Sequence, residues 1–548
     1  MRFADDPAKE DYSLRYAPKA FRTWKPWQVY VAAIGSLAAM AGYALGGGFA
    51  ESFGAPNALM GEIISSAVIF VTGIPLALAI ARHNIDIDLL TRGSGFGYLG
   101  STITSLVYAT FTLIFVAFEG SIMAQALSAL APIPIRLSYV VVSLSIIPLV
   151  IYGMRFTAKF QAITQPIWVL LVLLAVGAVA VKPGVWTALG SFHGPAVSSA
   201  SMAPLAVGAV AAALLSGVAQ IGEQGDYLRF MPERSSSNRR SWLAAVLLGG
   251  PGWVLIGIFA FVAGMLLTTY AAPKVGMAKA DVPVTMFQLA FARLVGNGHV
   301  ALVVAALFVI LSQVKINIMN AYSGSLSWSN FFSRILHRHP GRVVWLVFQV
   351  LVGLAIMEAG IFGAIGTVLA VYSNVAVAWI GCLISDIVVN GKLLDLRPAG
   401  VEFKRAHLHN FNPVGFGSMI AASAVALAAY FGAFGHVAAV LSSFIALAAA
   451  FVMPPVVAFA TGSRYYVART SLPDPADALE HLCVRCSRSY ESMDMAHCPF
   501  HSGNICSLCC SVESACHDAC KALGLHEPLG STIRVMPGSR KATVEGVA

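Results

Sequence analysis

The chain has 548 residues, of which 57% are hydrophobic and only 11% are charged. A soluble globular protein carries about 25% charged residues, so this chain could not cover a soluble surface of its size. The composition excludes a soluble multidomain enzyme and a disordered protein, and it predicts a helical membrane protein with many spans. Unbroken apolar runs such as residues 167–181 argue against the alternating strands of an outer-membrane barrel.

Twelve apolar segments are candidates for helices that cross the membrane, which takes about 20 residues each. They are residues 28–50, 59–81, 98–128, 137–154, 160–181, 203–228, 243–267, 299–322, 343–358, 362–388, 415–433 and 437–461. The sequence therefore predicts an all-α polytopic membrane protein with twelve transmembrane helices.

The basic residues indicate how these helices are oriented. If the N-terminus lies inside, 23 lysines and arginines fall in inner segments and 5 in outer ones. The excess of positive charge inside places both termini in the cytoplasm. The net charge of +9 is thus mainly a topology signal, and no basic patch interleaved with aromatic residues indicates nucleic-acid binding. Residues 1–27 are polar and lack the apolar core of a cleavable signal peptide.

The positions of the apolar segments and of the cysteines divide the chain into five parts. They are a cytoplasmic N-terminal segment (1–27), a twelve-helix transporter domain (28–465), a linker (466–482), a Cys-rich zinc-binding module (483–521) and a flexible C-terminus (522–548).

Two of the predicted helices contain glycines mixed with polar residues, at 42–48 in the first and at 217–226 in the sixth. Interrupted helices are tolerated at membrane depth only around a cavity or inside protein. Interruptions five helices apart predict two inverted repeats, helices 1–5 and 6–10, with a ligand site between them. Close helix packing is the alternative. It accounts well for the glycines at 46–48 and poorly for Glu223 and Asp226.

Four short motifs occur in order along these segments. DYSLRY spans residues 11–16, RGSGFGYLG spans 92–100, GDYLRF spans 225–230 and NIMNAYS spans 317–323. In this order the chain resembles the nucleobase–cation symporter-1 family, the purine–cytosine permease-like transporters, over about residues 11–465. The resemblance implies a five-plus-five inverted repeat followed by two further helices, in a bacterial inner membrane. It also implies a carrier of nucleobases, hydantoins, allantoin or related heterocycles, often with sodium or protons.

Ionisable side chains at membrane depth are costly, so each is a candidate for function. They are Glu119, Glu223, Asp226, Lys315 and Glu358, with Glu62 and Asp386 nearer helix ends. Asp226 is interpreted as the partner of Arg229 in an ion pair at the helix end. Glu119 shares a helix face with Phe115, four residues away. A carboxylate there favours a ligand with donor groups, a cationic ligand or proton coupling, and a structural pair with Lys315 is the alternative.

The resemblance implies roles for further residues. Helix 3 of the family offers a ring and a polar group, often an amide, to the heterocycle, where this chain has Phe115 and Glu119. Helix 8 of sodium-coupled members offers two adjacent hydroxyls to the ion, where this chain has Ser312 beside Leu311 and Lys315 one turn on. A fixed ammonium repels a sodium ion at low dielectric, so we hypothesise that Lys315 stands in for the coupling cation.

Asn317 corresponds to an amide that holds the ligand in the family, and no tryptophan between residues 204 and 230 offers a second stacking face. The predicted substrate-binding residues are Tyr43, Phe115, Glu119, Gln220, Glu223 and Asn317, and the predicted ion-coupling residues are Glu119, Ser312 and Lys315.

Eight of the nine cysteines fall within residues 483–520. The predicted metal ligands are Cys483, Cys486, Cys498, Cys506, Cys509, Cys510, Cys516 and Cys520. Disulfides are disfavoured in a reducing cytoplasm, and these thiols suit two tetrahedral Zn²⁺ sites. An iron–sulfur cluster, a redox pair and free structural cysteines are the alternatives. Metal would supply much of the folding energy of so small a module.

Residues 494–499 and 505–510 resemble a Cys-rich segment found where bacterial permease-like modules join signalling kinases. No kinase or ATP-binding segment follows here, so we expect the tail to dock a separate cytoplasmic partner.

The sequence predicts a secondary active transporter for a nucleobase-like or related nitrogenous heterocycle, working by alternating access and proton-coupled or sodium-independent. The alternative is a membrane sensor that keeps the transporter fold and signals through its zinc tail. No hydrolytic or nucleotide-binding motif is present, so we expect no enzyme activity.

Overall fold

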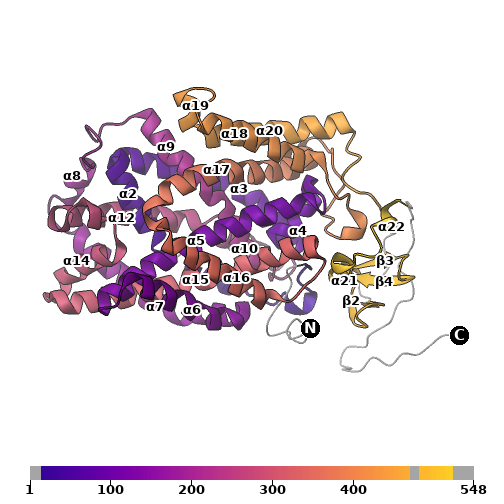
Figure 1. Cartoon of the computed structure of the whole chain (residues 1–548), viewed down its shortest axis with the longest axis horizontal. Coiled ribbons are helices and arrows are strands. Elements are labelled where there is room, and N and C mark those ends of the chain that lie inside the picture. The colour runs from indigo at the N-terminus through magenta and orange to yellow at the C-terminus, as the bar shows by residue number, and fades with distance from the viewer. Residues whose placement is uncertain (1–13, 37, 470–479, 523–548) are drawn as a thin grey trace.

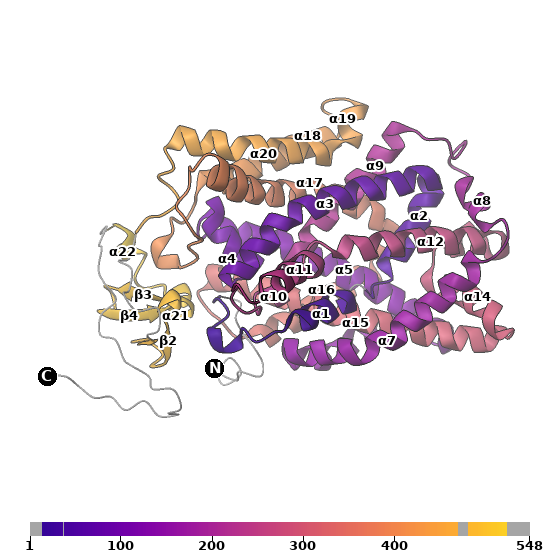
Figure 2. The same ribbon diagram turned by 180° about the vertical axis from the view of Figure 1, so that it is seen from behind.

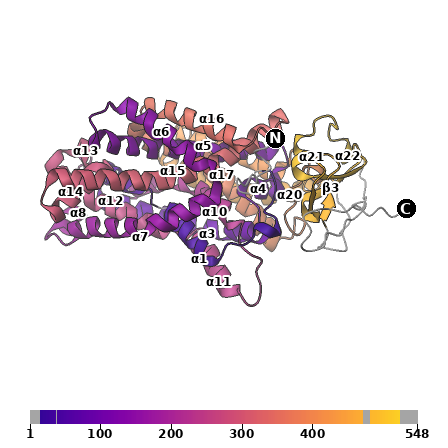
Figure 3. The same cartoon turned by 90° about the horizontal axis from the view of Figure 1, so that it is seen from below.

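The computed structural model describes residues 14–36, 38–469 and 480–522. Long helices run roughly along one direction, and the Cys-rich module lies at one end of the bundle (Figure 1). The view from below shows the same separation of bundle and module (Figure 3). Parts of the expected N-terminal segment, linker and C-terminus lie outside the described residues.

The elements of the membrane domain follow the predicted segments. The first half holds η1 (Lys19–Phe21), α1 (Pro26–Ser36), α2 (Ala41–Phe53), α3 (Ala55–His83), α4 (Ile87–Thr91), η2 (Arg92–Phe96), α5 (Gly100–Leu130), α6 (Ile135–Ile151), α7 (Gly153–Ala180) and α8 (Val185–Gly190). The second half holds α9 (Pro204–Leu214), η3 (Leu215–Gln220), α10 (Ile221–Leu228), α11 (Arg239–Gly249), α12 (Trp253–Val275), α13 (Met277–Ala280), α14 (Pro283–Val295), α15 (Gly298–Leu336), α16 (Arg342–Glu358), α17 (Ile361–Ile384) and η4 (Ser385–Leu393). They are followed by η5 (Arg405–His407), η6 (Pro413–Gly417), α18 (Ser418–Tyr430), α19 (His436–Val440) and α20 (Ser442–Thr461).

Among the described residues, nine helices are long and apolar enough to cross a membrane. Two shorter apolar helices, α6 and α14, accompany them. Each of the twelve predicted segments holds a helix or an interrupted helix. The all-α membrane fold is therefore confirmed, whereas the number of twelve crossings stays a prediction. Helix α14 was not among the predicted segments.

The first span is interrupted between α1 and α2, where the described residues 38–40 are not helical. The glycine cluster at 42–48 is instead helical, inside α2, so the predicted place of the break was wrong. These glycines bring α2 against α12: a Cβ on Gly46 would lie 2.1 Å from the Phe261 carbonyl oxygen. A Cβ on Gly264 would lie 2.1 Å from the Tyr43 carbonyl oxygen. Close packing through small residues accounts for this cluster.

The interruption of the sixth span is a stretch of 3₁₀-helix, η3, which joins α9 to α10. A tighter helix in the middle of a span changes the direction of its side chains and exposes backbone groups. This interruption, Leu215–Gln220, overlaps the predicted region of residues 217–226.

The Cys-rich module contains two antiparallel two-stranded sheets. Its elements are β1 (Glu480–Leu482), β2 (Ser489–Glu491), η7 (Ser492–Asp494), β3 (Met495–Cys498), β4 (Gly503–Cys506), α21 (Ser507–Val512) and α22 (Ala519–Ala522). Strand β1 pairs with β2 and β3 pairs with β4. The short helices α21 and α22 both pack against η5 of the membrane domain.

The chain before α1 also contacts the module. Arg15 Nε donates to Asp494 Oδ2 at 2.7 Å, and the Asp494 carboxylate is 1% exposed. The backbone N–H of Lys19 donates to Glu491 at 2.7 Å, and the Tyr16 hydroxyl also contacts Glu491. From this end, α1 enters the bundle beside α10 and α11 (Figure 2). The module therefore holds the segment that leads into the interrupted first span.

Candidate functional site

A cavity of about 140 Å³ opens where the two interrupted spans meet α3, α5, α12 and α15. Its volume is many times what a single water molecule needs. Its main polar and aromatic lining residues are Glu62, Ser65, Ser66, Phe111, Phe115, Glu119, Ser216, Gln220, Trp253, Phe261 and Asn320. The rest of the lining is mostly apolar, which is usual for small-molecule sites in proteins.

Glu119 of α5 lies at the break in the first span. Its carboxylate accepts the backbone N–H of Ala41, the first residue of α2, at 3.3 Å. The amide of Gln313 on α15 accepts the Met40 N–H at 3.1 Å and donates to the Glu119 carbonyl oxygen at 2.7 Å. Gln313 also donates to the Glu119 carboxylate. A negative charge at a helix N-terminus is favourable and satisfies its free N–H groups, so these two side chains stabilise the start of α2.

Aromatic rings form two walls of the cavity. Phe115 and Phe111 lie with ring centroids 4.8 Å apart on α5. Trp253 and Phe261 of α12 also line the cavity. A Cβ on Gly217 of η3 would lie 3.4 Å from the Trp253 indole, which is ordinary van der Waals contact, so η3 packs directly against that ring. Trp253 therefore offers an aromatic ring to the cavity from the helix that follows the sixth span.

Glu62 is a second carboxylate of this cavity that sequence reasoning set aside as close to a helix end. It lies on α3, is 7% exposed, and accepts a hydrogen bond from the Ser66 hydroxyl at 2.9 Å. The signal was available, since Glu62 is an ionisable residue in an apolar segment. Its burial in the cavity wall depends on how α3 packs against α9, which the sequence alone does not specify.

Three of the predicted substrate-binding residues lie outside the lining of the cavity. Tyr43 is fully buried and its ring meets Phe287 at 5.2 Å, edge to face. Glu223 is fully buried within α10. Asn317 is buried on α15, where Asn320, one turn further on, lines the cavity instead. The structure brings together only Phe115, Glu119 and Gln220 of the predicted set.

The predicted ion-coupling residues on α15 face α7. Lys315 Nζ donates to Thr164 Oγ1 at 2.9 Å and to the Gln161 carbonyl oxygen at 3.4 Å. The Ser312 hydroxyl accepts from the Trp168 indole N–H at 2.7 Å. Lys315 and Ser312 are therefore partners of α7, and the side-chain partner of Glu119 is Gln313 instead of Lys315.

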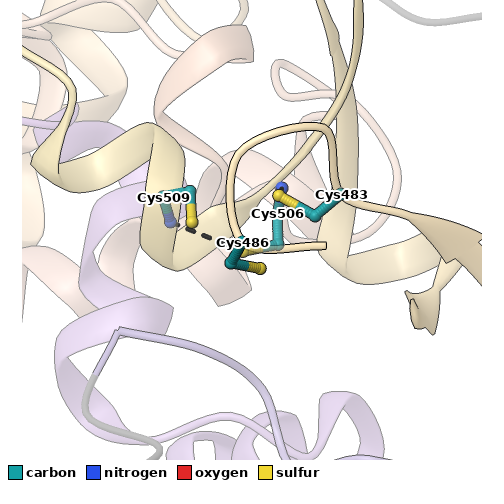
Figure 4. A group of neighbouring side chains, drawn as sticks. All are labelled: Cys483, Cys486, Cys506 and Cys509. Carbon is teal, nitrogen blue, oxygen red and sulfur yellow. Dashed lines mark hydrogen bonds between the residues drawn. The ribbon is translucent and has the colours of Figure 1, made fainter. Parts of the chain in front are cut away.

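The second candidate site is a cluster of four cysteines in the module, Cys483, Cys486, Cys506 and Cys509 (Figure 4). Their sulfur atoms lie within 4.8 Å of one another. Tetrahedral zinc with metal–sulfur distances of about 2.3 Å places its sulfurs about 3.8 Å apart, so this arrangement fits a metal ion.

Backbone amides hold two of these sulfurs in place. The Cys506 N–H points to Cys483 Sγ at 3.4 Å, and the Cys509 N–H points to Cys506 Sγ at 3.5 Å (Figure 4). Such donors favour thiolates and fix the direction of ligands. The other four predicted ligands, Cys498, Cys510, Cys516 and Cys520, lie outside this cluster.

Comparisons with known proteins identify the fold. No protein-family model and no curated protein matches the sequence. The structure is similar to Mhp1, a nucleobase-cation-symport-1 family transporter, in a closed conformation with bromovinylhydantoin bound. The TM-score is 0.59 at 18% identity, over 84% of this chain and 99% of that one.

Two further structures share the fold. The inward-facing conformation of Mhp1 gives a TM-score of 0.58 at 17% identity, over 82% of this chain and 94% of that one. A substrate-bound, outward-open Na⁺-coupled sialic acid symporter gives 0.53 at 14% identity, over 83% of this chain and 94% of that one. The chain is thus a multi-pass membrane protein with the fold of secondary transporters, and the two proteins in these three structures are symporters, not enzymes.

Proposed function

We propose that the chain is a secondary active transporter of the nucleobase–cation symporter-1 type, which carries a small nitrogenous heterocycle by alternating access. The observation that supports this most is the cavity between the two interrupted spans, with carboxylates and aromatic rings on its walls. Interrupted helices that meet around a cavity are typical of inverted-repeat transporters, whose substrates bind near the middle of the membrane.

The lining favours a particular kind of ligand. Phe115 and Trp253 offer faces on which a flat ring can stack. Glu119 and Glu62 offer hydrogen-bond acceptors, so the ligand should present N–H donors or a positive charge. Two buried carboxylates in one cavity also favour uptake of a cation with the ligand, and a proton is the simplest one.

Lys315 supports sodium-independent coupling in this proposal. Its ammonium already lies between α7 and α15, held by Thr164 and the Gln161 carbonyl. A fixed positive charge there would hold the two helices together as a bound cation would. Ligand binding measured with sodium replaced by choline tests this, since a strong loss of affinity would contradict it.

The proposal places the protein in a bacterial inner membrane with both termini in the cytoplasm. Zinc is the proposed metal of the four-cysteine cluster, because four thiolates in a closed tetrahedral site are typical of structural zinc. An iron–sulfur cluster is the alternative, and the absorption spectrum of the purified protein distinguishes the two.

A ligand sensor is the second candidate function, and one observation favours it. The Cys-rich module contacts both the chain before α1 and η5, so movement of the membrane domain on ligand binding would reach the module. A sensor would pass this change to a cytoplasmic signalling partner. Counterflow of radiolabelled heterocycles in proteoliposomes separates the two functions, because a sensor binds without flux.

A further inference from the structure

The eight cysteines of the module fall into two groups of four. The first is the cluster described above, and the second lines a separate small cavity. That cavity is lined by Cys498, Cys510, Cys516 and Cys520, together with neighbouring side chains of the module and Ala406. All nine cysteines of the chain are free thiols, so no disulfide occupies the second group.

The local structure explains why the two groups are separate. Cys509 and Cys510 follow each other in α21, and successive residues of a helix point about 100° apart. They cannot therefore both point to one metal ion. In the β3–β4 hairpin, Cys506 pairs with Met495 and Cys498 pairs with Gly503. Three residue steps along a strand separate those pairs by about 10 Å, too far for one tetrahedral site.

We propose that Cys498, Cys510, Cys516 and Cys520 bind a second soft divalent metal ion, with Zn²⁺ as the natural candidate. The inference rests on the proposed metal binding of the module and is independent of transport. It divides the eight thiols into Cys483, Cys486, Cys506 and Cys509 for the first ion and the remaining four for the second.

The acidic side chains around the second cavity already have basic partners. Asp518 pairs with Arg405 at 2.9 Å and with Lys521 at 3.1 Å. Glu513 contacts Arg485, and its carboxylate lies 2.7 Å from His501 Nε2. The carboxylates are thus engaged in ion pairs, and the four thiols, with the His497 imidazole beside them, remain as the soft donors of the lining.

Basic residues of the membrane domain and of the linker that follows it lie beside the second site. Four thiolates around a divalent cation carry a net charge of −2, which is stabilised by positive groups around the ligands. Arg405 Nη1 donates to the Cys510 carbonyl oxygen at 2.7 Å. Arg469 Nη1 donates to the His497 carbonyl oxygen at 3.0 Å, next to Cys498. The second metal ion would therefore fix the part of the module that docks on the membrane domain.

Metal content of the full-length protein, purified in detergent after growth with zinc, tests the proposal. We expect two zinc ions per chain by mass spectrometry. The Cys516→Ser/Cys520→Ser variant should retain one ion, and so should the Cys483→Ser/Cys486→Ser control. One ion in the wild type, unchanged in the first variant and absent in the control, would overturn the second site and leave the first intact.

A measurement on the unchanged protein guards against variants that fail to fold. Alkylation with iodoacetamide, mapped by peptide mass spectrometry, should leave Cys510, Cys516 and Cys520 protected until a chelator is added. Rapid alkylation of these three thiols while Cys483 and Cys506 stay protected would contradict the second site. No bound metal and no protection at either group would overturn metal binding by the module as a whole, whatever the outcome of the transport assay.

Discussion

Gln313 of α15 and Glu119 of α5, which are 194 residues apart in the sequence, are hydrogen-bonded to each other beside the break in the first span. The Gln313 amide accepts from Met40, while the Glu119 carboxylate accepts from Ala41. Two side chains thus satisfy the backbone at the start of α2 while Glu119 also faces the cavity. A ligand that hydrogen-bonds to the Glu119 carboxylate would compete with the Ala41 N–H at the start of α2. Ligand binding would thereby be linked to the conformation of this half-helix.

The first prediction concerns Glu119 as the acceptor for the ligand. Glu119→Gln should weaken binding of the best heterocycle from a panel of purines, pyrimidines and hydantoins by roughly 10- to 100-fold, since hydrogen bonds to charged groups contribute about 1.5–3 kcal/mol. Isothermal calorimetry in detergent measures it. Glu51→Gln is the control, because Glu51 lies on α2 and lines a different cavity. Equal affinity in wild type and Glu119→Gln would refute the role.

The second prediction concerns the aromatic wall. Phe115→Ala should reduce affinity for the same heterocycle by roughly 10-fold, because stacking on an aromatic ring contributes about 0.5–1.5 kcal/mol beyond the area buried. Phe118→Ala is the matched control: Phe118 lies on the same helix, but its ring packs against Phe362 at 5.5 Å. Similar losses in both variants would indicate a general packing defect and not a stacking site.

The third prediction concerns Gln313 as the support of the broken span. Gln313→Leu removes the partners of Met40 and Glu119 and should lower the free energy of unfolding by about 1–3 kcal/mol, the cost of unsatisfied buried groups. Thermal unfolding in detergent measures this loss. Gln165→Leu should change little, because the Gln165 amide makes no hydrogen bond within the part of the chain that the structure describes. An unchanged melting temperature for Gln313→Leu would contradict the stabilisation of the start of α2 by Gln313.

The fourth prediction concerns Lys315. Uptake should continue when sodium is replaced by choline, and Lys315→Met should reduce uptake because α15 loses two hydrogen bonds to α7. Lys159→Met tests for a general effect of charge, since Lys159 is exposed on α7, the helix that Lys315 contacts. Uptake that stops in choline would show that sodium is required and that Lys315 does not replace it.

The fifth prediction concerns Glu402, which orders the turn before Arg405. Its carboxylate accepts the N–H groups of Phe403 and Lys404 at 2.9 Å each and contacts His407 at 2.6 Å. Burial alone would raise the pKa of Glu402, but Lys404 and His407 lower the pKa to about 2.

Because this pKa is lower in the folded state, the stabilisation by Glu402 is complete above its ordinary value of about 4.5 and is lost as the pH falls towards 2. Glu402→Gln should loosen the turn that positions Arg405 against the module, and so should speed proteolysis of the module at pH 7. The difference in proteolysis rate from wild type should shrink near pH 3. Arg464→Ala is a nearby control, since Arg464 contacts the adjacent Tyr465. A difference in proteolysis rate that persists at low pH would contradict the stabilising role of the ionised Glu402 carboxylate.

Much of the architecture could be predicted from hydropathy, because a buried span needs a long apolar segment wherever it packs. Phe115 and Glu119 could be placed side by side from the sequence because a spacing of four residues brings two side chains onto one helix face, and both line the cavity. The prediction of where the first span breaks was wrong, because a cluster of glycines has the same sequence pattern whether it interrupts a helix or packs against a neighbouring helix. Only the approach of α12 to Gly46 distinguishes the two.

Other parts of the site depend on how distant helices rotate towards each other. Trp253 and Glu62 line the cavity because α12 and α3 turn one face to it, which no local pattern specifies. Lys315 and Ser312 turn away from it for the same reason. The cysteines were recognised by spacing, but their division between two groups needed the β3–β4 register and the direction of α21.

Counterflow in proteoliposomes tests the central claim most directly. Vesicles that hold the purified chain and an unlabelled heterocycle of the binding panel should accumulate the radiolabelled compound. Vesicles with the Glu119→Gln variant should accumulate far less, and those with Glu51→Gln should match the wild type. Tight binding of the heterocycle to the wild type without any counterflow would contradict transport and make the chain a sensor.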